Sequence, residues 1–105
     1  MIEMSKSIPT PNDKEVKELI ALYKAKDFNK LKNKADAILE KNKEHHIALN
    51  ILGLSFTAQG EIKKALRSFD ESIKIKPDYA VAYNNKANIF LKKKEYDEAI
   101  IFSKK

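Results

Sequence analysis

Few residues in this sequence have the type and spacing to carry out chemistry. His45 and His46 form its one histidine cluster, and Asp70–Glu71 and Asp97–Glu98 are adjacent acidic pairs. Two neighbouring histidines could bind a metal, but apart from Glu44 no further Cys, His or carboxylate stands at ligand spacing around them. The acidic pairs have no partner base, and neither a Ser/His/Asp set nor a phosphate-binding loop is present. The sequence therefore predicts no enzyme, no metal site and no cofactor, and it favours a polar turn at the histidines.

The basic residues of the chain suggest a possible phosphate-binding patch. The run Lys92–Lys93–Lys94 could contact phosphate, but it closes a predicted helix, where lysine also interacts favourably with the helix dipole. The net charge of +6 is spread along the chain, with +2 in residues 1–45, +1 in 46–79 and +3 in 80–105. Arg67 is the sole arginine, although bidentate grip on phosphate or bases favours arginine. The sequence therefore favours nucleic-acid binding least among the possible functions.

The composition predicts a helical domain. The chain has 105 residues, enough for one domain, of which 43% are apolar and 34% charged. Two glycines and three prolines leave few turn signals for a β-rich fold, and the absence of cysteine excludes disulfides. No apolar run reaches the length of a signal-peptide core or a membrane span. We expect no membrane partner and, by default, a cytoplasmic location.

Apolar residues recur at helical spacing along most of the chain. We expect residues 1–11 to be irregular and residues 12–105 to form one domain. The expected helical stripes cover residues 16–23, 28–39, 47–56, 62–75, 80–91 and 96–102. The predicted breaks are Lys26–Asp27, the polar run 40–45, Gly60, Pro77 and Lys94–Glu95.

The stripes belong to a repeat of 34 residues. Shifting the sequence by 34 places identical residues together at Ala48/Ala82, Asn50/Asn84, Phe56/Phe90, Glu61/Glu95 and Ala65/Ala99. A further shift towards the N-terminus keeps the apolar pattern but loses the small residues. The period predicts helical hairpins at about 12–45, 46–79 and 80–105.

The repeat resembles the tetratricopeptide (TPR) family. The residues that carry the resemblance are Leu49-x-x-Leu52-Gly53-x-x-Phe56, Ala65-x-x-x-Phe69, Pro77 and the segment 94–100. This resemblance implies an all-α superhelix of about three antiparallel hairpins, a right-handed solenoid whose last hairpin is incomplete. Small residues such as Gly53 and Ala65 would stand where paired helices cross closely. Lys86, where the family has leucine, departs from the pattern.

In the family, the first helices of the hairpins line a concave groove that holds a peptide. Carried over residue by residue, the groove candidates in the second hairpin are Ile47, Asn50, Ile51, Leu54 and Thr57. Those in the third hairpin are Val81, Asn84, Asn85, Asn88 and Lys92, and Lys17, Ile20 and Lys24 would continue the surface in the first.

The candidate groove residues suggest two kinds of contact. An asparagine amide offers a donor and an acceptor to a ligand backbone, and asparagine is otherwise mediocre inside a helix. Ile47, Ile51 and Leu54 form either an apolar patch in the groove or part of the core against the first hairpin. Some family members bind a C-terminal carboxylate through a set of cationic side chains in the groove. The matching positions in the second hairpin are Asn50 and Leu54, so the sequence does not indicate this mode of peptide binding.

The resemblance implies a protein-interaction module that binds a protein or peptide partner. The alternative is the N-terminal region of a larger enzyme, for example a transferase, which the stack orients or oligomerises. The apolar run Ile100–Ile101–Phe102 has no capping helix after it. We expect either that the chain continues in a longer protein, which is favoured, or that this uncapped hairpin self-associates.

Overall fold

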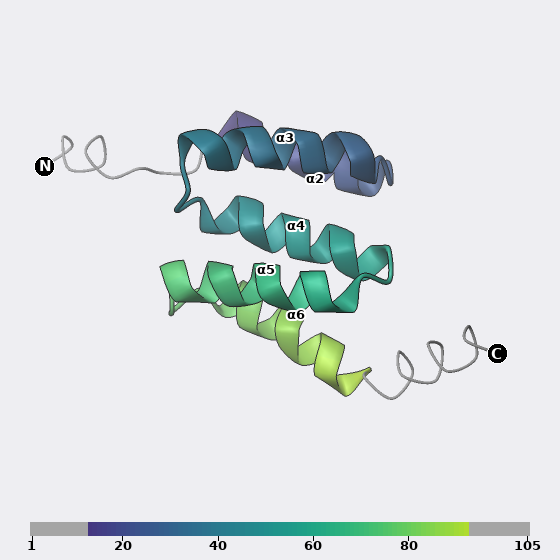
Figure 1. Ribbon diagram of the computed structural model, residues 1–105, viewed down its shortest axis with the longest axis vertical. Coiled ribbons are helices and arrows are strands. Elements are labelled where there is room, and N and C mark those ends of the chain that lie inside the picture. Colours follow the sequence, from purple (N-terminus) through teal and green to yellow (C-terminus); the bar gives the residue numbers. More distant parts are fainter. Residues whose placement is uncertain (1–12, 93–105) are drawn as a thin grey trace, which may run out of the picture.

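The computed structural model describes residues 13–92, which form helices joined by short turns, with no strand in that range (Figure 1). The helices are α2 (Asp13–Lys24), α3 (Phe28–Lys41), α4 (His46–Ala58), α5 (Ile62–Ile75) and α6 (Ala80–Leu91). The predicted irregular segment 1–11 and the predicted second helix of the last hairpin, including Ile100, Ile101 and Phe102, lie outside the described residues.

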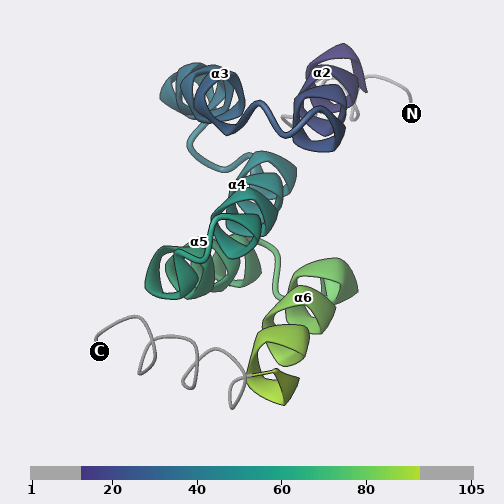
Figure 2. The same cartoon turned by 90° about the vertical axis from the view of Figure 1, so that its right-hand side faces the viewer.

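The helices pack in two layers. Helices α2, α4 and α6 lie side by side and form what we call the inner layer, while α3 and α5 form the outer layer (Figure 2). Helices α3 and α5 begin at residues 28 and 62, and α4 and α6 begin at residues 46 and 80, so both spacings are 34 residues. The predicted all-α helical-repeat fold is confirmed.

Local signals account for the turns between helices. Asp27 is the N-cap of α3, because its Oδ1 accepts a hydrogen bond of 3.3 Å from the amide nitrogen of Lys30. Gly60 follows α4 with a φ of 81°, a left-handed conformation that glycine adopts without a steric penalty. Pro77 follows α5, where a proline ring prevents continuation of the helix. These three signals set the lengths of the helices.

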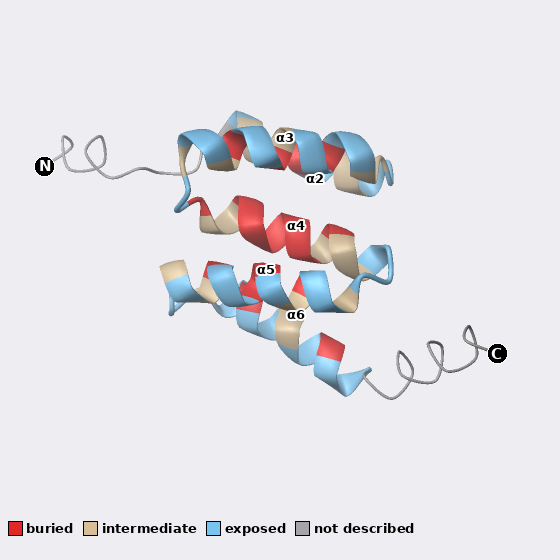
Figure 3. Cartoon of the chain, in the orientation of Figure 1, coloured by how far each residue is buried: buried red, intermediate tan, exposed pale blue. Residues whose placement is uncertain are grey.

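Two apolar clusters hold the layers together, and α4 contributes to both. The first cluster joins α2, α3 and α4, and its buried members are Leu19, Leu31, Ala35, Ile38, Ala48, Ile51 and Leu52. The second joins α4, α5 and α6 around buried Ala65, Phe69 and Ile89, with Leu54 and Phe56 of α4 packed against it. Figure 3 shows α4 as the most continuously buried helix. Its sequence contains no Asp, Glu, Lys or Arg.

Within the described part of the chain, no helix combines the length and the apolarity that crossing a bilayer requires.

Gly53 allows α4 and α5 to approach closely. A methyl group at this position would lie 2.6 Å from Cδ1 of Phe69, whose side chain is fully buried. Such a distance is far shorter than van der Waals contact, so the Phe69 ring occupies the space that a Cβ atom would need. The small residue predicted at the crossing is therefore matched by a large one on the facing helix.

His45 is the N-cap of α4, and its side chain is buried. Its Nδ1 accepts a hydrogen bond of 3.1 Å from the amide nitrogen of Ala48, and the residue is 2% exposed. Its Nε2 is buried and has no hydrogen-bond partner in the described structure. Burial lowers the pKa of His45, and the nearby Glu15 carboxylate only partly opposes that effect. The imidazole is thus a neutral cap.

We predict that Gly53→Ala lowers the free energy of unfolding by about 1–3 kcal/mol, the usual cost of overpacking a core. Alanine has a higher helix propensity than glycine by ~1 kcal/mol, which offsets part of this loss. Urea unfolding followed by circular dichroism measures the change.

The control is a double-mutant cycle with Phe69→Leu, which removes the ring that the new methyl group would meet. We expect Gly53→Ala to cost less in the Phe69→Leu background than in the wild type. An equal cost in both backgrounds would contradict the proposed contact.

We predict that the protein loses stability as the pH falls from 7.5 to 5.5. The folded-state pKa of His45 lies below its ordinary value of about 6.5, so below pH 6.5 the unfolded chain binds more protons than the folded one. Protonation also removes the Nδ1 lone pair that accepts from Ala48. Urea unfolding at several pH values measures the slope.

His45→Asn keeps a side-chain acceptor at the N-cap but cannot titrate. We expect it to flatten the pH dependence, whereas His46→Gln should retain the contribution of His45. Identical slopes for the wild type and His45→Asn would show that this histidine does not couple protonation to folding.

Candidate functional site

The inner layer presents a small hollow between α4 and α6. It has a volume of about 170 Å³ and is lined by Leu54, Thr57, Phe69, Asn85, Asn88, Ile89 and Lys92. Five of these residues (Leu54, Thr57, Asn85, Asn88 and Lys92) are groove candidates from the sequence. Phe69 comes from α5 and forms part of the apolar floor. The structure therefore brings half of the candidates of the second and third hairpins to one place.

A side-chain hydrogen bond sets the position of Asn85 beside this hollow. The amide nitrogen of Asn85 (Nδ2) donates to Oδ1 of Asn50 over 2.9 Å. Asn50 is 3% exposed, so it offers almost no surface to a ligand and instead orients Asn85. In residues 13–92 this is the one hydrogen bond that the Asn85 side chain makes, which leaves its carbonyl oxygen as an acceptor.

The apolar candidates divide between the core and the hollow. Ile51 is buried in the first cluster and Ile47 is half-buried against it, so both support the packing of α4 on the first hairpin. Leu54 is half-buried against the second cluster and also lines the hollow. The sequence left open whether these three residues form a patch or the core, and the structure assigns only Leu54 to the hollow.

The remaining candidates lie on exposed parts of the inner layer. Val81 is 47% exposed, and Asn84, Asn88 and Lys92 are also exposed on or just after α6. On α2, exposed positions are Lys17, Ile20 and Lys24, which share one helix face by their spacing. These residues surround the hollow or extend the surface beyond it, but the structure does not place the α2 residues at the hollow itself.

The prediction from sequence missed two residues that line the hollow, Phe69 and Ile89, and one contact between repeats. Ile89 lines the hollow, and its position one turn after Asn85 could have indicated this. The pairing of Asn50 with Asn85 joins residues 35 apart, one repeat plus one residue. Self-comparison aligned Asn50 with Asn84 instead, because a repeat alignment identifies equivalent positions and not contacts.

The histidine pair has a structural role in the described part of the chain. The ring of His46 packs edge-on against Tyr79, with centroids 4.7 Å apart, and its carbonyl oxygen accepts a hydrogen bond of 2.8 Å from the Ser72 hydroxyl. Burial lowers the pKa of His46, and the Lys76 ammonium adds to this effect. Residues 13–92 contain no group of three potential metal ligands. His46 therefore links α4 to α5 and to the turn before α6, whereas His45 caps α4.

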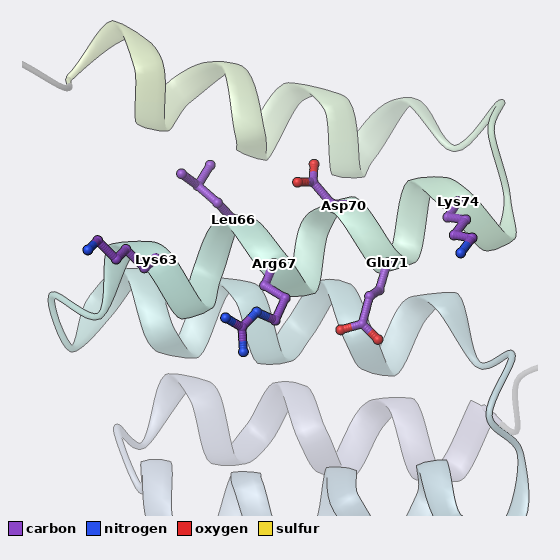
Figure 4. A pocket seen from close by; sticks show the side chains of 6 residues that line it. All are labelled: Lys63, Leu66, Arg67, Asp70, Glu71 and Lys74. Atoms are coloured by element: carbon purple, nitrogen blue, oxygen red, sulfur yellow. The ribbon is translucent and has the colours of Figure 1, made fainter.

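A second, more open hollow of about 420 Å³ lies along the outer helix α5 (Figure 4). Its lining residues are Lys63, Leu66, Arg67, Asp70, Glu71 and Lys74. They carry both signs of charge, and Asp70 forms an ion pair with Lys86 of α6. This pair explains how Lys86 is accommodated where the family has leucine.

Comparison with known proteins agrees with this fold. A family model described as a TPR repeat matches residues 53–94. The chain is 30% identical over 60 residues to the tetratricopeptide repeat domain-containing protein PYG7, chloroplastic, from Arabidopsis thaliana. The matched region covers 50% of this chain and 20% of that protein, so the chain spans about a fifth of the relative's length. Residues 53–94 therefore match the tetratricopeptide repeat, and the described helix pairs have the 34-residue period of that repeat.

Proposed function

We propose that the inner layer binds a segment of a protein partner at the hollow between α4 and α6, without catalysis. The family serves in general as a protein-interaction module, which supports this class of function. The observation that carries the proposal is the convergence of Leu54, Asn85, Asn88 and Lys92 on one surface hollow. An apolar floor beside amide and ammonium groups suits a peptide, which has both apolar side chains and backbone hydrogen-bonding groups.

The amides define the expected contacts. Asn88 is exposed at the rim and presents a donor and an acceptor, while Asn85 is fixed by Asn50 before any ligand arrives. A side chain that is already ordered loses less conformational entropy on binding. We therefore expect Asn85 to fix the orientation of the bound segment, and Asn88 to form additional hydrogen bonds with the same segment.

We predict that Asn85→Ala combined with Asn88→Ala weakens partner capture by at least about tenfold, since two lost hydrogen bonds correspond to roughly 1.4 kcal/mol or more. The measurement is affinity capture on the immobilised 105-residue chain from a lysate of the source organism, with quantitative mass spectrometry of the recovered proteins. A Lys41→Ala variant, altered on the outer helix α3, is the matched control and should recover the same partner as the wild type. Equal recovery by the double variant would exclude this site.

Self-association is a second candidate function, favoured by a separate face of α6. Tyr83, Phe90 and Leu91 are 47%, 51% and 82% exposed, and their spacing places them on one side of the helix, away from buried Ala82 and Ile89. Contiguous exposed apolar side chains are typical of interaction surfaces. A second copy of the chain could cover this face while leaving the hollow accessible.

If this face mediates self-association, the molar mass from light scattering should rise with protein concentration towards that of a dimer. Phe90→Glu combined with Leu91→Lys should abolish the rise, because charged side chains disfavour burial against a second apolar face. A constant monomer mass at high concentration would remove the second candidate and leave the first unaffected.

A further inference from the structure

The first hairpin, helices α2 and α3, is attached to the other described helices through α4 (Figure 2). Both helices approach α4, whereas no Cα atom of α2 or α3 lies within 8 Å of a Cα atom of α5 or α6. The buried apolar cluster that joins the hairpin to the stack is made of side chains of α2, α3 and α4. The packing of the first hairpin on the stack therefore depends on α4 and on how that helix begins.

The two histidines at the start of α4 contact different neighbours. The Glu15 carboxylate of α2 acts on the His45 imidazole, and Nδ1 of that ring accepts a hydrogen bond from Ala48, which is a member of the apolar cluster with α2 and α3. By contrast, the carbonyl oxygen of His46 accepts a hydrogen bond of 2.8 Å from the hydroxyl of Ser72 on α5. The start of α4 is thus held to α5 by His46, while His45 lies at the contact with the first hairpin.

A second proton on the His45 ring is incompatible with these contacts. In the neutral ring Nδ1 is the acceptor for Ala48, so Nε2 carries the hydrogen, and that N–H is buried without a partner in the described structure. Protonation would place an N–H on Nδ1 as well, opposite the N–H of Ala48. It would also put a positive charge at a helix N-terminus, where the helix dipole is positive, on a residue that is 2% exposed. The charged ring is therefore stable only after it has moved into solvent.

The charges around the ring do not compensate for this burial. Glu15 on α2 favours the charged ring, but burial has the larger effect and lowers the pKa of His45. On α4, the neighbouring His46 adds repulsion when both rings are protonated. The charged residues at the end of α3 and in the turn, Glu40–Lys41 and Lys43–Glu44, are exposed and of opposite signs. The folded contact is therefore favoured at neutral pH, and this advantage declines as the pH falls through the ordinary histidine pKa of about 6.5.

We propose that protonation of His45 releases the first hairpin from α4 while α4 stays packed on α5, so that this contact is a pH-sensitive joint within the stack. The inference goes beyond a loss of overall stability, because it assigns the loss to the packing of α2 and α3 on α4. One structural unit of a protein commonly opens at a lower free energy than the whole fold. Release would expose the apolar side chains of Ile51 and Leu52. The hollow lies between α4 and α6, so the inference does not depend on the proposed function.

Hydrogen exchange on the full 105-residue chain at pH 7.5 and pH 5.5, corrected for the intrinsic pH dependence of exchange, tests the inference. Protection at the buried residues Leu19 and Ile38 of the first hairpin should fall by up to about tenfold. This is the limit that an open-state pKa of about 6.5 sets between the two pH values. Protection at Phe69 and Ser72 of α5 should fall less. An equal fall in both hairpins, or no fall in the first, would overturn the inference.

Three variants identify the group that titrates. His45→Asn keeps a side-chain acceptor at the N-cap but cannot titrate, so the first hairpin should show the same protection at both pH values. His46→Gln removes the other imidazole and should retain the wild-type difference. Glu15→Gln removes the carboxylate that favours the charged ring, so the difference should persist or increase. A pH effect that survives in His45→Asn, or that disappears in His46→Gln or Glu15→Gln, would overturn the inference, because a group other than His45 would then respond to pH.

Discussion

Helix α4 packs against α2 and α3 through one set of side chains and against α5 and α6 through another. Ile51 and Leu52 belong to the first apolar cluster, while Leu54 and Phe56 pack against the second. A helix that is apolar on all sides and carries no formal charge gains stability only when neighbours surround it. The 34-residue unit that contains α4 is therefore stable only inside a stack, and the positions of α2 and α6 follow from the need to cover it.

This burial also explains why the hollow has a fixed polar rim. Asn50 lies in the middle of the buried helix, and an amide without a partner there would cost about 1–3 kcal/mol. Asn85 of α6 meets that need, and in doing so its own position is determined. The same logic applies to Ser55, whose Oγ accepts from Nε2 of Gln59 over 3.1 Å. The candidate site is thus a consequence of how the core satisfies its polar groups.

Helix positions could be predicted from the sequence because their signals are local. The backbone conformation at the helix ends depends on the residues located there, namely Gly60, Pro77 and the polar run 40–45. The 34-residue period then predicts the same hairpin in each unit. Exposure was harder to predict. Ile51 and Leu54 are three residues apart on one helix, yet the first lies in the core and the second lines a hollow, because neighbouring helices differ on the two sides of α4.

Contacts between repeats were the least predictable feature. A self-alignment places Asn50 over Asn84, but the hydrogen bond to Asn50 comes from Asn85. Which residue makes that contact depends on the side chains that pack between neighbouring helices, such as Ile89 with Phe69, and these are properties of pairs of helices. Single-residue patterns do not encode them. The charge of Lys86 illustrates the same point, since its partner Asp70 belongs to another helix.

Helix α6 is attached to the stack through few residues. Its fully buried side chains in the described chain are Ala82 and Ile89, supplemented by the Asn85–Asn50 hydrogen bond and the Lys86–Asp70 ion pair. A ligand in the hollow would contact α4 and α6 at once, and a molecule that binds only the docked arrangement stabilises it by mass action. Because the floor of the hollow includes Phe69 and Ile89, which also hold α6 in place, occupancy of the site and docking of the helix are energetically coupled. A ligand proposed to bind in the hollow would therefore also stabilise the packing of α6 on the stack.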